Sequence, residues 1–239
     1  MNIIGIDPSL ISTALVVSSK DSFKIYNYCR ESDAYGKKGL TKWFKFADEY
    51  VNYRFIEYRD FEDYSEGELT KLKDYDKITD QIIDDILENI DTSKETKIGI
   101  EGYNFGAQVG DLVDLVAFST LLRKKLFDKV SKDITVLSPS TLKLESCKLT
   151  YEPTVKEIGG KNPRKEYKWR NNLGISGGKF QKPDMYYAII ENNTFDDYWA
   201  KHCKLMKGDI TSVKNINKPY EDVNDSYLIY QVLKKQNPI

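Results

Sequence analysis

Four carboxylates in this 239-residue chain stand where an acidic side chain is costly unless something neutralises it. Asp7 follows the apolar run NIIGI, and Glu101 follows a second such run, KIGI. Asp222 and Asp225 lie three residues apart in EDVNDSYLI, a spacing that puts both on one face of a helix. Carboxylate oxygens are the ligands that Mg²⁺ prefers, and Mn²⁺ accepts the same set. Two such ions about 3.5–4 Å apart can activate a water and stabilise the leaving oxygen of a phosphodiester.

Each acid has a simpler explanation when it is taken alone. An Asp-Pro pair after a strand, here Asp7-Pro8, is typical of a turn. Asp222 would stabilise the N-terminus of a helix through the helix dipole. Glu101 is harder to explain in this way, because a Glu-Gly pair after a buried strand contributes little to the structure. The metal-site hypothesis therefore depends on the elements that would bring the four acids together.

The order of the expected elements predicts an α/β protein. Runs rich in Ile, Val and Tyr predict five strands, at 2–7, 12–19, 23–30, in TKIGIEG and in ITVLSPS. Apolar steps of three and four residues predict helices from about 69 to 90, at 109–130, in PDMYYAIIEN and in EDVNDSYLIYQVLKK. Ser140 is a candidate cap of a further short helix, YVNYRFIEYRDF could add a strand or hairpin, 151–180 looks irregular, and 194–218 has no assigned form.

Three hairpin-connected strands followed by strand–helix–strand units predict a mixed five-stranded sheet with helices on both faces. This is the layout of the ribonuclease H-like fold. If the first and fourth strands are neighbours in it, Asp7 and Glu101 meet at one end of the sheet. A final helix packed there would bring Asp222 and Asp225 to the same point, and four carboxylates so close together require a cation.

Five segments, in order along the chain, resemble the RuvC Holliday-junction resolvases, and the versions from phages and viruses more than the shorter bacterial ones. They are IGIDPS, IGIEGYNFGAQ, VLSPSTLK, GGKFQKPDM and EDVNDSYLI. The resemblance implies that the four acids bind Mg²⁺, with Mn²⁺ as a substitute, and that Lys182, with Lys143, lies near the scissile phosphate. It also implies a homodimer that cuts four-way DNA junctions in recombination and repair and leaves 5′-phosphate ends.

Some positions depart from the family pattern. Ser9 and Ala14 stand where bacterial members usually have glycine, and Ser226 stands where many members have alanine. All three changes are small. The whole chain, 1–239, reads as one nuclease domain with insertions near 31–67, 151–176 and 194–218, and these insertions would reshape the DNA channel.

A basic segment and two aromatic residues are the candidates for DNA contact. Residues 155–182 hold eight Lys and Arg residues and two Glu residues, which indicates either a polyanion-binding face or a solvated loop. Aromatic rings beside a phosphodiester site can stack on unpaired bases, and the family carries an aromatic residue nearby for a similar purpose. The candidate DNA-binding residues are Tyr103, Phe105, Lys143, Lys161, Arg164, Lys165, Lys168, Arg170 and Lys179.

The predicted helix at 109–130 is apolar on two stripes, so one can cover the sheet and the other a second subunit or one of the chain's own insertions. The sequence shows no apolar run long enough to span a membrane and no secretion signal. Three widely spaced cysteines indicate free thiols in a reducing cytoplasm, which for a viral protein would be that of the host cell.

Three other functions compete with junction cleavage. A related nuclease would act on flaps, forks or RNA–DNA hybrids. A sugar-kinase or actin-like ATPase also begins with an Asp-containing β-hairpin, but its phosphate loop normally carries Gly where Ser9 stands, and this chain is short for its two domains. A catalytically silent binding module would not require all four acids.

Overall fold

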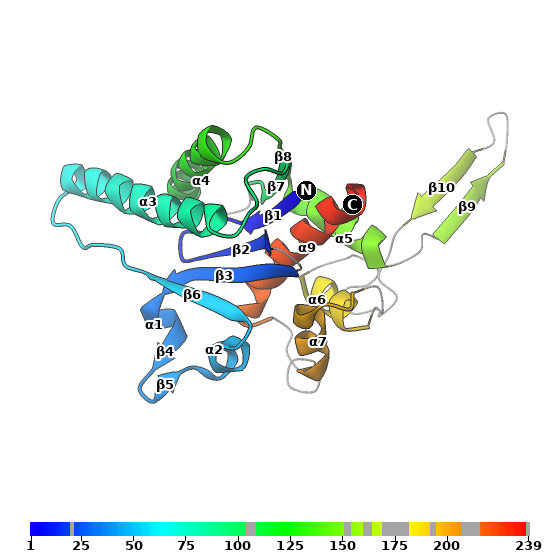
Figure 1. Cartoon of the computed structure of the whole chain (residues 1–239), viewed down its shortest axis with the longest axis horizontal. Coiled ribbons are helices and arrows are strands. Elements are labelled where there is room, and N and C mark those ends of the chain that lie inside the picture. The colour runs from blue at the N-terminus through cyan, green and yellow to red at the C-terminus, as the bar shows by residue number, and fades with distance from the viewer. Residues whose placement is uncertain are drawn as a thin grey trace. The chain divides into compact units, whose positions relative to one another are not determined.

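A mixed six-stranded sheet with the strand order β6-β3-β2-β1-β7-β8 forms the centre of the first part of the chain (Figure 1). The computed structural model describes residues 1–19, 22–103, 109–150, 154–159, 164–168, 182–191, 195–206 and 216–237. The strands of the sheet are β1 (Asn2–Asp7), β2 (Ser12–Ser19), β3 (Ser22–Arg30), β6 (Val51–Ile56), β7 (Thr96–Glu101) and β8 (Ile134–Leu137).

The directions of the strands define the fold. β2 pairs antiparallel with both β1 and β3, whereas β1–β7, β7–β8 and β3–β6 are parallel pairs. A hairpin-connected trio followed by parallel crossover strands on the β1 side is the ribonuclease H-like arrangement, which confirms the predicted fold class. The sheet has six strands rather than the expected five, because residues within the insertion at 31–67 add β6 beside β3.

Helices cover both faces of this sheet (Figure 1). α3 (Tyr64–Leu87) and α4 (Val109–Lys129) pack on one face, and α9 (Tyr220–Gln236) packs on the other. Side chains of β1 alternate between these faces: Ile4 and Ile6 join the core beneath α3 and α4, whereas Gly5 contacts α9. The same alternation places Asp7, two residues after Gly5, on the face that α9 covers.

The remaining elements of the first part lie within the insertion between β3 and β6. They are α1 (Glu31–Ala34), β4 (Tyr35–Gly36), β5 (Gly39–Leu40) and α2 (Lys42–Ala47). Phe44 of α2 is buried against Cys29 and Ala34 and forms a small separate core. The aromatic residues of this insertion thus serve packing within the described structure, as in the contact between Phe44 and Tyr53.

Residues 140–217 form a second compact unit, and residues 1–139 and 218–239 form the first. Its elements are most of α5 (Pro139–Thr150), β9 (Thr154–Ile158), β10 (Arg164–Lys168), α6 (Lys182–Glu191) and α7 (Tyr198–Leu205). The assignment of the whole chain to one nuclease domain with three insertions stays a prediction.

Two local expectations for this second unit were wrong. Part of the segment expected to be irregular forms the antiparallel hairpin β9–β10, whose register sets Lys165 opposite Glu157 and Glu166 opposite Lys156. Charged rather than apolar residues alternate in it, so the usual strand signal is absent. α5 begins at Pro139, a favoured first helical residue, so Ser140 lies within its first turn rather than capping it.

Candidate active site

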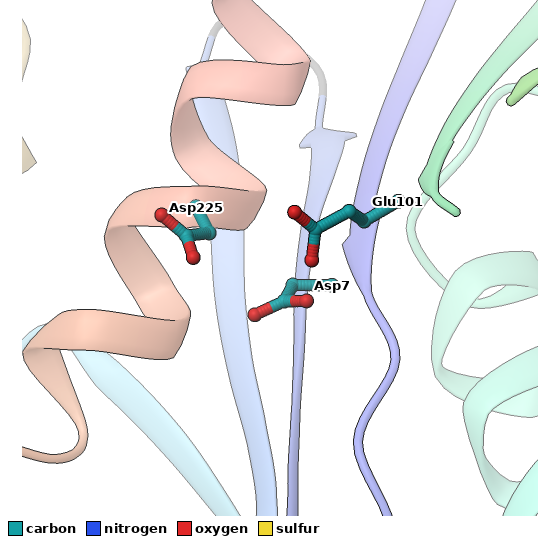
Figure 2. Close-up of side chains that lie close together, drawn as sticks. All are labelled: Asp7, Glu101 and Asp225. Carbon is teal, nitrogen blue, oxygen red and sulfur yellow. The ribbon is translucent and has the colours of Figure 1, made fainter. Parts of the chain in front are cut away.

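Asp7, Glu101 and Asp225 converge at the C-terminal ends of β1 and β7 (Figure 2). One carboxylate oxygen from each residue lies within 4.8 Å of the corresponding oxygens of the other two. Asp7 and Asp225 are buried, and Glu101 is half-buried. Three carboxylates at this separation are a suitable donor set for a divalent cation with oxygen ligands.

The electrostatics of Asp7 show that this cluster lacks a compensating charge of its own. Burial, together with the negative charges of Glu101 and Asp225, raises the pKa of the Asp7 carboxyl well above its ordinary value. A hydrogen bond with Glu101 and the charge of Asp222 act in the same direction. A cation bound among these oxygens would reverse this effect, because it stabilises the ionised carboxylates.

Two glycines allow α9 to deliver Asp225 to the sheet. A Cβ atom on Gly5 would lie 2.3 Å from the backbone oxygen of Ser226 and 2.7 Å from the backbone nitrogen of Tyr230. A Cβ atom on Gly99 would lie 2.5 Å from the side chain of Ile229. The helix therefore lies directly on the β1 and β7 backbones, one turn along from Asp225.

Asp222 lies on the same helix but has its own partners. The Ser12 hydroxyl donates to Asp222 Oδ2 over 2.5 Å, and the Lys218 ammonium lies 3.3 Å from the same oxygen. Ser12 in turn accepts a hydrogen bond of 3.1 Å from Asn27 Nδ2. Asp222 is thus close enough for its charge to affect Asp7, and its own role as a metal ligand stays a prediction.

The sequence analysis missed Ser12, Asn27 and Lys218. A signal was present for Asn27, which is a fully buried amide in the otherwise apolar and aromatic run IYNYC. Lys218 gave no comparable signal, because a lysine before a helix is ordinary.

Tyr103 is the candidate stacking residue whose placement is described. Its ring lies 4.5 Å from the guanidinium carbon of Arg123, and its hydroxyl lies 3.1 Å from Thr120 Oγ1. Arg123 also donates to the backbone oxygen of Glu101 over 3.2 Å. These contacts from α4 hold a half-exposed aromatic ring beside the acidic cluster.

The other predicted DNA contacts lie in the second unit or outside the description. Lys143 is half-buried on α5, and Lys182 is exposed at the start of α6. Arg164, Lys165 and Lys168 are on β10. Their approach to the carboxylates stays a prediction. Phe105, Lys161, Arg170 and Lys179 lie outside the described residues.

No protein-family model matches the sequence, and no curated protein matches it. Among solved structures, T. thermophilus RuvC in complex with a Holliday junction substrate has a TM-score of 0.47 and 9% identity, over 99% of this chain and 96% of that chain. A Thermus thermophilus RuvC structure has a TM-score of 0.42 and 11% identity, over the same shares. Since both TM-scores are below 0.5, the fold assignment rests on strand order and direction.

None of the described helices combines the length and the apolar character needed to cross a lipid bilayer.

Proposed function

We propose that this protein is a metal-dependent endonuclease that cuts branched DNA, with four-way junctions as its principal substrate. The convergence of Asp7, Glu101 and Asp225 on a ribonuclease H-like sheet carries the proposal. The resemblance of five ordered segments to RuvC resolvases, of the phage and virus type, supports the choice of substrate.

The residues of the chain divide the work among themselves. Asp7, Glu101 and Asp225 would hold Mg²⁺ or Mn²⁺, which supplies activation of a water and stabilisation of the leaving oxygen when it is bound. Tyr103, held by Arg123 and Thr120, would stack on a base next to the cut phosphate. Lys182, with Lys143, is the proposed basic group near that phosphate, so Lys182→Ala should lower turnover more than DNA binding.

Homodimer formation is part of the same proposal, because two symmetric cuts in a junction require two sites. α4 supports it. Phe118 and Leu122 face the core, whereas Val113 is 62% exposed and Phe127 is 46% exposed. An apolar surface of this kind on a helix next to the site is suited to a second subunit.

The ATPase alternative is disfavoured by the loop that follows Asp7. The backbone N–H of Ser9 donates to Thr13 Oγ1 over 3.0 Å, and the Thr13 hydroxyl donates back to the Ser9 oxygen over 2.7 Å. A phosphate-binding loop presents its N–H groups to the nucleotide, whereas this one is used within the protein.

Cleavage of labelled synthetic substrates tests the proposed function. Four-way junctions, forks, flaps, RNA–DNA hybrids and linear duplex would each be incubated with Mg²⁺, Mn²⁺ or EDTA. We expect paired nicks in the junction with 5′-phosphate ends, far slower cutting of linear duplex, and no cutting in EDTA. Preferential cutting of flaps, forks or hybrids would favour the related nuclease function, and undiminished cutting in EDTA would exclude both.

A further inference from the structure

Asp222 differs from the other three acids because a cation of the protein itself already neutralises it. Its Oδ2 atom lies 3.3 Å from the Lys218 ammonium, and its side chain is 7% exposed. The Lys218 side chain is 32% exposed, so the ammonium reaches the acid from the solvent side. Among Asp7, Glu101 and Asp225, by contrast, the like charges raise the pKa of Asp7.

A chain of hydrogen bonds holds Asp222 independently of Lys218. Asn27 Nδ2 donates to Ser12 Oγ, so the one proton of that hydroxyl is directed to Asp222 Oδ2. In the described part of the chain, the buried Asn27 Oδ1 has no hydrogen-bond partner. An unpaired buried amide oxygen is destabilising, which indicates that this chain of donors serves the position of Asp222 rather than stability.

Charge then determines the order in which cations bind. A divalent ion among Asp7, Glu101 and Asp225 has no ammonium to displace in the contacts described. An ion that uses Asp222 Oδ2 meets Lys218 at the same oxygen, and two cations sharing one oxygen repel each other. If Lys218 withdraws toward solvent, Ser12 still holds Asp222 for the arriving ion.

We propose that Lys218 is a built-in counter-ion of Asp222 that competes with a second divalent cation. Binding is then ordered, with a first ion at Asp7, Glu101 and Asp225 and a second, weaker ion at Asp222. Lys218 is a positioning residue in this scheme, because it acts through Asp222. The inference rests on the proposed metal-dependent nuclease function.

Titration calorimetry with Mn²⁺ alone, in the absence of DNA, tests the order of binding on the full chain. The test variant is Lys218→Gln, which keeps a hydrogen-bonding side chain and removes the charge. Lys97→Gln is the matched control, because Lys97 pairs with Asp133 at the same 3.3 Å, its side chain is 25% exposed, and it lies four residues before Glu101 on β7. Asp222→Asn serves as the reference without the second site.

We expect two binding steps in the wild type and in Lys97→Gln. In Lys218→Gln the second step should tighten about fivefold, the size of a partly exposed ion pair, with the first step changed less. Asp222→Asn should lose the second step. A second step that stays the same or weakens in Lys218→Gln, or one-ion binding in both proteins, overturns this inference and leaves the nuclease intact. A wild type that binds no Mn²⁺ overturns the metal site itself.

Discussion

Gly5 and Gly99 are direct partners across the parallel pair of β1 and β7, and α9 crosses the sheet over both of them. With no side chain at either position, the helix backbone reaches the strand backbone at Gly5. This contact sets the depth at which Asp225 meets Asp7 and Glu101. A pair of glycines on the face opposite the main core is therefore part of the site, although neither residue can bind a metal.

Gly5→Ala should destabilise the fold and displace Asp225. The added methyl group would meet backbone atoms of α9, which cannot turn aside as a side chain can, so the free energy of unfolding should fall by at least about 1–3 kcal/mol. Gly99→Ala should cost less, because it meets the side chains of Ile229 and Leu233. Urea denaturation with Mn²⁺ titration would measure both effects.

Gly36→Ala is the control for this pair, because its Cβ atom would meet other atoms no nearer than 3.9 Å. Equal stability losses in all three variants would mean that the close approach of α9 does not set the effect.

Asp7→Asn should abolish cleavage, retain junction binding and stabilise the metal-free fold. Since burial and neighbouring acids raise the Asp7 pKa, the metal-free protein loses stability as pH rises from the unfolded pKa of about 3.9 through the folded one. The variant lacks that loss. Thermal melts in EDTA, compared with junction cleavage in Mg²⁺, would show the opposite signs. Glu101→Gln and Asp225→Asn should also lose cleavage.

Asp128→Asn, at an exposed acid paired with Lys124 on α4, is the control for the acid variants. Near-normal turnover in any of the three site variants would remove that residue from the site.

The single histidine of the chain should give the protein a pH-dependent stability. Burial lowers the pKa of His202, on α7, to about 4. The unfolded chain therefore binds a proton near pH 6.5 that the folded chain refuses, so stability should fall by about 2 kcal/mol as pH drops from 6.5 toward 4. Urea midpoints between pH 7 and 5 would measure the slope.

His202→Gln should remove the part of this slope above pH 5, where few carboxylates of ordinary pKa titrate. A slope that persists unchanged in the variant would assign it to other groups.

The basic segment should supply much of the electrostatic affinity for DNA. Each phosphate that is neutralised releases counter-ions, so log affinity falls with log salt by about 0.9 per contact on duplex DNA. Replacing Lys161, Arg164, Lys165 and Lys168 with Ala should weaken binding and flatten the slope by up to roughly 4 units, while the preference for branched DNA survives. Fluorescence anisotropy across a salt series would measure this.

Replacing Lys37, Lys38, Lys234 and Lys235 removes the same number of charges from the other compact unit and is the control. An unchanged slope in the test variant would mean that the segment is a solvated loop.

The exposed face of α4 should mediate dimer formation. Val113→Glu introduces a charge into its apolar surface, so light scattering at micromolar concentration should change from the dimer mass to a monomer mass near 27.7 kDa. Leu205→Glu, at an 81% exposed apolar residue on α7, should leave the dimer intact. A wild type that is monomeric both in solution and on a junction would contradict the proposed homodimer.

Local pattern was enough to place two of the acids. Strand alternation and the apolar runs before Asp7 and Glu101 set where β1 and β7 end, because burial of alternate side chains depends on nearest neighbours along the chain. The three-residue spacing of Asp222 and Asp225 likewise put both on one face of a helix. The fold class followed from the order of the elements. The charged hairpin β9–β10 was missed, because its residues do not alternate between apolar and polar.

The tertiary structure alone decided how the fourth acid is used. Asp222 and Asp225 share a helix face, yet Asp225 joins Asp7 and Glu101 while Asp222 meets Ser12, a residue 210 positions away in the chain. Local periodicity carries no information on such a contact, which depends on the register of β1 against β2 and on the depth of α9 over the sheet. That depth is set by the missing side chains of Gly5 and Gly99, whose partners on α9 are defined only once the chain has folded.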